Sequence, residues 1–293
     1  MENKLQQAAA CMPLRLRSSL EQLDAEIQQQ CEEIRMRVEC PLTVAVGRQE
    51  HCIPNTRVTT ADVQETVDRA AEYSFHAVSD SMRQGYITAS GGHRIGICGQ
   101  TAVHQGEVLS FRSISSLNIR IAREIHGAAK PDLLHALQKN GCLQSALFLA
   151  PPGIGKTTLL RDLARQLSDT GIRTAIADER SELAAMVRGV PQFDIGQHTD
   201  VLDGCPKAEA AMMLVKTMSP MLLVMDELTA EQDVRAAVYA SHCGAAVIAS
   251  AHAWDIDDFK LRPLYKELMQ AAVFSQYYQI SSDRTVHQIN WEA

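Results

Sequence analysis

The sequence lacks an excess of basic residues. Of its 293 residues, 28 are Lys or Arg and 35 are Asp or Glu, so the net charge is −7 with the histidines neutral. Proteins that bind duplex nucleic acid usually present a basic surface that neutralises the phosphates. Nucleic acid is therefore not expected as a partner, although a locally basic pore is compatible with this average.

The eight cysteines lack the spacing of a metal or redox site. They form no Cys-x-x-Cys pair, and no His-x-x-x-His motif accompanies them. A structural zinc site or a redox dithiol would need such spacing. We therefore expect reduced, buried thiols in a cytosolic protein.

Long apolar runs are also missing. No run approaches the ~18 to 20 residues that cross a bilayer, and the first ten residues, MENKLQQAAA, have no hydrophobic stretch of a secretory signal. The expected location is the cytoplasm, where contact with a membrane protein stays open. With 46% hydrophobic residues the chain is globular and long enough for one large core or two modest ones.

The character of the sequence changes near residues 126–132, HGAAKPD, a stretch with the Gly and Pro typical of a link between domains. We expect a smaller N-terminal α+β domain over residues 1–125 and a linker over 126–132. Residues 133–293 then form a second domain of the α/β class.

The N-terminal half contains patterns for helices and for short strands. Apolar residues recur at roughly helical intervals over Leu14–Val38, with a capping pattern near the start and Pro41 beyond the end, so we expect one long helix there. A second helix should begin near Thr60, and the Gly91–Gly96 run should be a turn into a strand. Short β-like runs are Leu42–Val46, Tyr86–Thr88, Arg94–Cys98, Val108–Phe111 and Asn118–Ile121.

The second half alternates apolar strands with helical stretches. The strands have no polar alternate face, so helices should cover both faces of a parallel sheet. An antiparallel hairpin of Phe274–Ile280 and Thr285–Trp291 is expected at the edge of this sheet. The four apolar strands are Ser145–Ala150, Arg173–Ala177, Met221–Met225 and Ala245–Ala251.

Residues 150–157, APPGIGKT, follow a strand and open a helix, which is the context of a phosphate-binding loop. Glycines let backbone N–H groups wrap a polyphosphate, Lys156 reaches the β and γ oxygens, and the Thr157 hydroxyl is a ligand for Mg²⁺. Ala150 replaces the first glycine of the strict motif, and a purely structural turn is the alternative. The residues expected to bind ATP are Pro152, Gly153, Ile154, Gly155, Lys156, Thr157 and Thr158.

Two carboxylates, Asp226 and Glu227, follow the strand Met221–Met225. Asp226 is expected to hold the Mg²⁺ ion, and Glu227 to orient or deprotonate the attacking water. The alternative is a strand that simply ends at the surface. Beside a phosphate loop the functional interpretation is favoured.

Two further strand ends carry polar residues. Glu179 and Glu182 follow the strand Arg173–Ala177, where they either approach the γ-phosphate or begin a helix rich in acids. His252 ends the strand Ala245–Ala251 and either senses the γ-phosphate or is an ordinary core or surface histidine. Strand ends at this edge face the ligand, so both groups are candidate site residues.

Arginines 112, 120 and 123 lie just upstream of the linker. A guanidinium supplied across a subunit boundary stabilises the charge of a phosphoryl-transfer transition state. Solvated arginines on an edge strand are the alternative for each of them.

The motifs GGHR (91–94), SSLNIRIARE (115–124), DERSE (178–182), TDVLDGCPKAE (199–209) and MSP (218–220) together resemble the stage III sporulation protein AA family of endospore-forming bacteria. The resemblance spans nearly the whole chain. It implies a mother-cell ATPase with a RecA-like P-loop NTPase core similar to type II and type IV secretion and pilus motors. Such a motor would form a homo-oligomeric ring, a hexamer, on the cytoplasmic side of a membrane-embedded channel complex that joins mother cell and forespore.

The resemblance also implies roles for individual residues. Lys156 and Thr157 would serve the phosphate loop, and Asp226 and Glu227 would serve the metal and the attacking water. Residues 178–182 match the acidic box of the secretion motors, and residues 250–252, with His252, match their histidine box. Arg120 and Arg123 are candidates for the arginines that those motors contribute from the N-terminal side.

Two other functions stay open. A small-molecule kinase would share the phosphate loop but would need an acceptor pocket and an arginine-rich lid. The sequence shows no such lid after the third strand. An ATP-gated structural ring would bind nucleotide without useful hydrolysis. Glu227 argues against such a ring, because a ring that only binds ATP has no need to activate water.

Overall fold

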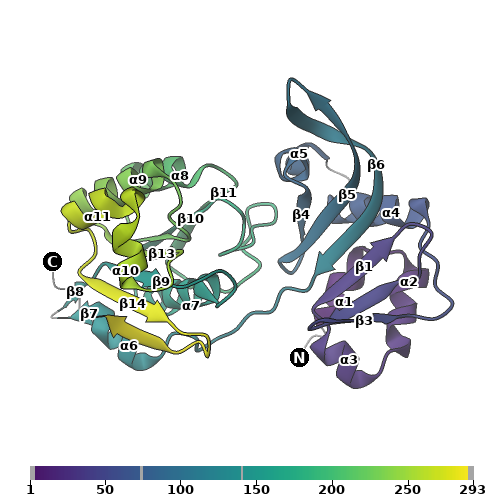
Figure 1. Ribbon diagram of the computed structural model, residues 1–293, viewed down its shortest axis with the longest axis horizontal. Coiled ribbons are helices and arrows are strands. Elements are labelled where there is room, and N and C mark those ends of the chain that lie inside the picture. The colour runs from purple at the N-terminus through teal and green to yellow at the C-terminus, as the bar shows by residue number, and fades with distance from the viewer. Residues whose placement is uncertain (1–3, 73–74, 140, 290–293) are drawn as a thin grey trace. The chain divides into compact units, whose positions relative to one another are not determined.

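The computed structural model describes residues 4–72, 75–139 and 141–289 (Figure 1). Its contacts divide the chain into two compact units. The first unit comprises Met1–Arg123 and Ala185–Gln192, and the second comprises Glu124–Ala184 and Phe193–Ala293. Residues 185–192 thus pack with the first unit, although they follow the second strand of the second unit's sheet in the chain.

A six-stranded antiparallel sheet forms the framework of the first unit, in the order β3-β2-β1-β6-β5-β4. Its strands are β1 (Glu33–Arg37), β2 (Thr43–Val46), β3 (Gln49–Cys52), β4 (Tyr86–Ala89), β5 (His93–His104) and β6 (Glu107–Arg120). The helices are α1 (Lys4–Ala8), α2 (Leu14–Ser19), α3 (Ala25–Gln30), α4 (Thr60–Ala70) and α5 (Phe75–Arg83), with 3-10 turns at Ala9–Cys11 and Leu20–Gln22. Alternate strand residues, such as Ile34 and Met36, are buried in one core with the helices, which gives an α+β unit.

The single long helix expected over Leu14–Val38 is wrong. Helix α2 ends at Ser19, whose hydroxyl donates to the carbonyl oxygen of Leu16 instead of capping a following helix. Further along, Ile34 and Met36 alternate with charged residues, a period of two that antiparallel pairing with β2 and β6 satisfies. The apolar spacing that suggested a helix therefore mixes short helices with a strand.

Other local predictions for this half are confirmed. Helix α4 begins at Thr60, and Thr59 caps it through a reciprocal pair of hydrogen bonds with Asp62. Gly91 and Gly92 have positive φ angles in the turn between β4 and β5. The start of the helix and the glycine pair are local features, which explains why the sequence alone located them.

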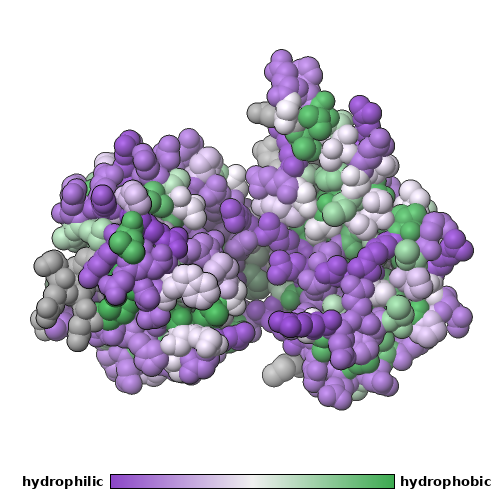
Figure 2. All heavy atoms as spheres, viewed as in Figure 1, coloured by the Kyte–Doolittle hydropathy of each residue, from purple (hydrophilic) through white to green (hydrophobic). Residues whose placement is uncertain are grey.

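The strands expected near residues 94–98, 108–111 and 118–121 belong to one long hairpin of β5 and β6, with register shifts along its length. The hairpin extends from the sheet as an arm (Figure 1). Apolar side chains gather near its end (Figure 2), where Val103 and Leu109 are about half exposed. The end of the arm therefore adds little to the core of the first unit.

The second unit contains a seven-stranded sheet in the order β11-β10-β12-β13-β9-β14-β15. All neighbours are parallel except β14 and β15, which form the expected antiparallel edge hairpin. Residues 290–291 of that expected hairpin lie outside the described residues. The strands are β9 (Ala146–Leu149), β10 (Thr174–Asp178), β11 (Thr199–Asp203), β12 (Leu222–Met225), β13 (Ala246–Ala251), β14 (Gln276–Ile280) and β15 (Val286–Ile289), beside a small pair of β7 (Gln138–Lys139) and β8 (Cys142–Leu143).

Helices cover this sheet. They are α6 (Pro131–Leu137), α7 (Lys156–Asp169), α8 (Lys207–Met218), α9 (Glu231–His242), α10 (Ile256–Leu261) and α11 (Lys266–Gln270), with a 3-10 turn at Pro263–Tyr265. Every residue of β9, β10 and β12 is buried, as expected for strands with helices on both faces. The predicted α/β class of this half is therefore confirmed.

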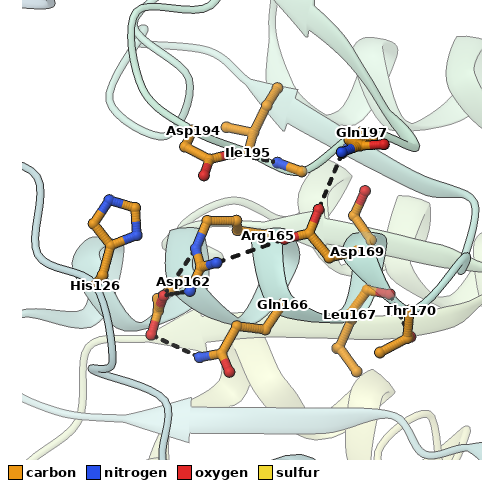
Figure 3. A network of polar contacts seen from close by, with 12 residues as sticks. His126, Asp162, Arg165, Gln166, Leu167, Asp169, Thr170, Asp194, Ile195 and Gln197 are labelled. Atoms are coloured by element: carbon orange, nitrogen blue, oxygen red, sulfur yellow. Dashed lines mark hydrogen bonds and ion pairs between the residues drawn. The ribbon is translucent and has the colours of Figure 1, made fainter.

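A polar network holds the outer side of α7 (Figure 3). The buried carboxylate of Asp162 accepts hydrogen bonds from the backbone of Ala129 (2.9 Å) and from the side chains of Arg165 and Gln166. Asp169, one turn further, forms an ion pair with Arg165 at 3.5 Å. These contacts fix the helix that the phosphate loop opens.

The expectation of buried cysteines is wrong. Only Cys31 is fully buried, and five thiols are exposed, namely Cys40, Cys52, Cys98, Cys142 and Cys243. Burial raises the pKa of Cys31 and of the partly buried Cys11 to about 11.

In the part of the chain that the structure describes, no helix has the length and apolar character needed to cross a membrane.

Candidate functional site

Four loops at one edge of the second unit's sheet carry the residues that the sequence singled out. They follow β9, β10, β12 and β13, which run parallel and therefore end at the same edge. The loops comprise residues 150–155, 226–230 and 252–255, and the first part, 179–184, of the longer loop after β10. Residues more than 90 positions apart in the chain thus meet at one site.

The loop between β9 and α7 has the backbone of a phosphate-binding loop. Gly155 precedes the first residue of α7 with a φ of 109°, and Gly153 has a φ of 80°. These left-handed conformations favour glycine over any other residue. The N–H groups at the start of α7 have no partners within the helix, so the loop and the helix N-terminus offer donors of the kind that can hold an anion.

The side chain of Lys156 folds back into the second unit and is only 3% exposed. Its ammonium donates to the carbonyl oxygens of Ala150 (3.2 Å) and Pro151 (3.0 Å), and it lies 3.8 Å from Oε1 of Glu227. Burial lowers the pKa of Lys156, whereas Glu227 and Asp226 act in the opposite direction. The cation is therefore held beside the loop that would bind phosphate.

Thr157 and Asp226 are in direct contact. The Thr157 hydroxyl donates to Oδ2 of Asp226, and the Ser250 hydroxyl donates to Oδ1, both at 2.5 Å. A hydroxyl and a carboxylate are hard oxygen ligands of the kind that Mg²⁺ prefers, and Mg²⁺ commonly takes one or two protein ligands beside water and phosphate. The residues present therefore fit a Mg²⁺ ion bound together with a nucleotide.

Glu227 and His252 complete the cluster. Nε2 of His252 lies 3.1 Å from Oε1 of Glu227, and its Nδ1 lies 3.0 Å from Nζ of Lys156. The side chains of Glu227 and His252 are each 28% exposed, so water reaches both. The structure thus brings Lys156, at the start of α7, together with Glu227 and His252 from two different loops.

The segment after β10 is a turn and not the start of a helix, which corrects that alternative for the acidic cluster. Buried Asp178 accepts hydrogen bonds from the backbone N–H groups of Glu182, Leu183 and Ala184, at 2.8 to 3.0 Å. Burial nevertheless raises the pKa of Asp178 to about 6. Asp178 therefore shapes the turn that carries Glu179 and Glu182.

Arg161 connects α7 to the same turn. Its guanidinium is buried and donates to the carbonyl oxygens of Leu183 (2.7 Å) and Glu182 (2.6 Å). It also lies over the ring of Phe193, 3.9 Å from the centroid. The helix that the phosphate loop opens is thereby tied to the acidic turn.

Two pockets of the second unit adjoin the cluster of Lys156, Glu227 and His252. A small pocket is lined by Glu179, Arg180, Glu182, Lys207, Asp226, Glu227 and Thr229. A larger cavity of about 920 Å³ is lined by Gly153, Ile154, Gly155 and Thr158 of the loop, together with residues that include Tyr278 and Arg284. Pro152 is exposed and lines neither pocket.

Arg120 and Arg123 belong to the first unit. Arg123 donates to the carbonyl oxygens of Gln29 and Cys31, the latter at 2.9 Å. Arg120 is largely exposed and lies 3.9 Å from Oε1 of Glu33. Arg120 is thus available at the surface, whereas Arg123 is engaged with the backbone.

Sequence reasoning missed Lys207. Its buried ammonium donates to the carbonyl oxygen of Glu227 at 2.5 Å and lies 3.9 Å from Oδ2 of Asp233. A cation at the first position of a helix opposes the helix dipole, so Lys207 is unusual at the start of α8, but no local pattern indicated its partner.

Solved structures share this fold. The pilus retraction motor PilT with bound ADP aligns with a TM-score of 0.61 at 16% identity, covering 90% of this chain and 77% of that one. The ATPase DotB of Legionella pneumophila aligns with a TM-score of 0.58 at 14% identity, covering 94% of this chain and 79% of that one. The expected fold class, a RecA-like P-loop core with a smaller α+β domain, is therefore confirmed.

A protein relative agrees over nearly the whole length. Stage III sporulation protein AA of Bacillus subtilis (strain 168) is 39% identical over 97% of this chain and 94% of its own. A family model described as sporulation stage III, protein AA, matches residues 2–290. The chain therefore belongs to the sporulation stage III protein AA family.

Proposed function

We propose that the second unit binds ATP with Mg²⁺ and hydrolyses it. The observation that carries this proposal is the contact of Thr157 with Asp226 beside Lys156 and Glu227, at the carboxyl edge of a parallel sheet. A loop that binds phosphate, a pair of metal ligands and an acid able to accept a proton are the parts that ATP hydrolysis requires. All three lie within one cluster.

Each residue then has a specific task. The loop N–H groups and Lys156 bind the phosphate oxygens, and Lys156 offsets negative charge on the β and γ groups. Glu227 accepts a proton from the attacking water, and His252, in contact with Glu227 and Lys156, orients both. Bound Mg²⁺ supplies charge neutralisation of the phosphates.

The cavity of about 920 Å³ is the place for the nucleoside. It begins at Gly153 of the loop and Thr158 of α7, on either side of Lys156 and Thr157, whose side chains contact the acidic cluster. Its volume is within the range of about 300–1,000 Å³ of small-molecule sites. Tyr278 of β14 lines this cavity from the sheet, with its buried ring stacked on Phe148.

The hydrolysis would power a motor. The related solved structures are described as an ATPase and as a pilus retraction motor, and the protein relative is a sporulation protein. We place the chain in a homo-oligomeric ring, a hexamer, in the mother cell. The ring acts on the cytoplasmic side of a membrane-embedded complex that connects mother cell and forespore during endospore formation.

The test is the ATPase rate measured against protein concentration, with the size of the assembly followed in parallel. A ring motor should show a specific activity that rises as the chain assembles. Lys156→Ala should remove ATP binding at every concentration. ATP turnover that transfers the phosphoryl group to a second substrate would indicate a kinase instead of a motor, and ATP binding without hydrolysis would indicate a structural ring.

A further inference from the structure

Glu227 has an unusual backbone conformation for a glutamate. Its φ is 54°, in the left-handed region, two residues after the end of β12. A residue with a Cβ adopts this conformation only at a steric cost, because its Cβ approaches the following carbonyl oxygen. It persists only where the surroundings fix the backbone firmly, and such strain is concentrated at functional sites.

The surroundings of Glu227 fix its backbone on both sides. Its N–H donates to the hydroxyl of Ser250 at 2.9 Å, and its carbonyl oxygen accepts from the ammonium of Lys207 at 2.5 Å. The N–H groups of Thr229 and Ala230 donate to Oδ2 of Asp233, at 3.0 and 3.1 Å. The loop after β12 is therefore held by side chains from three other elements.

Of the three side chains that hold this loop, Lys207 is the one whose burial costs the most free energy, because it buries an ammonium group. Its side chain is 8% exposed, and the ion pair that it forms with Asp233 is long, at 3.9 Å. That carboxylate oxygen already accepts the two backbone hydrogen bonds of the loop. Burying an ammonium is expensive unless hydrogen bonds compensate, and the short hydrogen bond of Lys207 is directed at the backbone of Glu227.

We propose that Lys207 is a positioning residue for Glu227. By holding the carbonyl oxygen, Lys207 keeps the left-handed turn that aims the Glu227 carboxylate at His252 and Lys156. Lys207 lines the same small pocket as Glu227, but its ammonium contacts the protein backbone and not the phosphate loop. This role rests on the proposed ATP hydrolysis.

The first test separates turnover from binding. Lys207→Met removes the donor, and it should lower kcat about 10- to 100-fold while the affinity for a fluorescent ATP analogue changes less than about twofold. Lys207→Arg keeps a donor and should recover a large part of kcat. Lys216→Met, on an exposed turn of the same helix, is the matched control and should behave as the wild type.

The second test needs neither nucleotide nor turnover. Hydrogen exchange in the nucleotide-free protein reports the amides of residues 227–230, which the network of Lys207, Ser250 and Asp233 holds. Lys207→Met should speed exchange at these amides, and Lys207→Arg should restore protection. Exchange that accelerates throughout the second unit would instead show a general structural role and would overturn the proposal.

The double variant distinguishes this inference from the proposed function. If Lys207 acts through Glu227, adding Lys207→Met to Glu227→Gln should cause no further loss of hydrolysis. A wild-type protein that does not hydrolyse ATP would overturn the proposed function, whereas the exchange result would still test the position of the loop. A Lys207→Met variant with normal kcat, or one whose ATP affinity falls as far as its kcat, would overturn the positioning role alone.

Discussion

The hydroxyl of Thr157 donates a hydrogen bond to Oδ2 of Asp226, a residue 69 positions later in the chain. The contact joins the start of α7 to the loop after β12 and sets a hydroxyl against a carboxylate. With the Ser250 hydroxyl on the other oxygen, the carboxylate of Asp226 is fixed in one orientation. The two oxygen groups that we propose as Mg²⁺ ligands are thus preorganised, which would reduce the cost of binding a metal ion.

Thr157→Ala should therefore weaken the binding of the Mg²⁺ ion that ATP hydrolysis needs. We expect the Mg²⁺ concentration for half-maximal activity to rise about 10- to 100-fold, as for the loss of groups that support a metal site. Thr157→Ser retains the hydroxyl and is the matched control. The measurement is a Mg²⁺ titration of ATPase rate, and identical titrations for both variants would argue against Thr157 as a ligand.

Glu227→Gln and Lys156→Ala should fail in different ways. Gln cannot accept a proton, so Glu227→Gln should bind ATP normally and lose about 100-fold or more in kcat. Lys156→Ala removes a cation beside the phosphates and should lose ATP affinity. Equilibrium binding and single-turnover hydrolysis measure the two effects separately. Normal turnover in Glu227→Gln would transfer the role to Glu179 or Glu182, which line the same pocket.

Asp178 should make the stability of the second unit depend on pH. Burial raises its pKa from 3.8 to about 6, so the folded state holds the proton more tightly than the unfolded state between these values. The free energy of unfolding should therefore fall as pH rises from about 4 to about 6, by about 1–3 kcal/mol, and then level off.

Urea unfolding of the wild type and of Asp178→Asn at several pH values checks this dependence. The asparagine does not titrate, so the difference in stability between the two proteins should shrink or reverse toward pH 6. A difference that stays constant across the window would show that Asp178 has an ordinary pKa.

Gly196→Ala should destabilise the fold more than Gly204→Ala. A Cβ at Gly196 would lie 2.5 Å from Cβ of Ser168 and 2.7 Å from the carbonyl oxygen of Arg165, on the outer side of α7. The resulting overlap costs about 1–3 kcal/mol. Gly204 has a similar positive φ but no atom within 4 Å, so its alanine variant should show the backbone cost alone, about 1–2 kcal/mol. Urea unfolding compares them, and equal losses would contradict the steric argument.

The sequence predicts the parallel sheet well because the signals are local. The strand that ends in Asp226 and Glu227 is apolar throughout, and the glycines and lysine of the phosphate loop stand directly between strand and helix. Once these strands are parallel, their ends must share an edge, so the cluster with His252 follows from topology. Residues far apart in the chain could thus be grouped correctly.

Other features depend on tertiary contacts that leave no local pattern. The hydrogen bond of Lys207 to Glu227 joins a side chain to a backbone carbonyl, and no sequence motif encodes the left-handed turn that requires it. Residues 185–192 leave the second unit after the acidic turn, and Gln192 accepts a hydrogen bond from Gly91 at 2.7 Å. Within Leu14–Val38, which the sequence predicted as one helix, the position of Ile34 fits a helical spacing and a strand equally well. Only its pairing with residues of β2 and β6 makes this segment a strand.

Arg120 and Arg123 offer the last prediction. Arg123 is engaged with the backbone of Gln29 and Cys31, whereas Arg120 is 66% exposed beside Glu33. If an arginine acts on the ATP of a neighbouring subunit, Arg120 is the better candidate, because it can leave a weak surface ion pair at little cost.

Arg120→Ala should therefore have low ATPase activity alone, and activity should return when it is mixed with Glu227→Gln. In mixed rings, some subunits that retain Glu227 receive Arg120 from a Glu227→Gln neighbour, so complete sites form again. Arg123→Ala should instead lower the thermal stability of the first unit, because two backbone carbonyl groups lose their donor. Recovery in mixtures with Arg123→Ala but not with Arg120→Ala would reverse the assignment, and no recovery with either would exclude both arginines from a role across subunits.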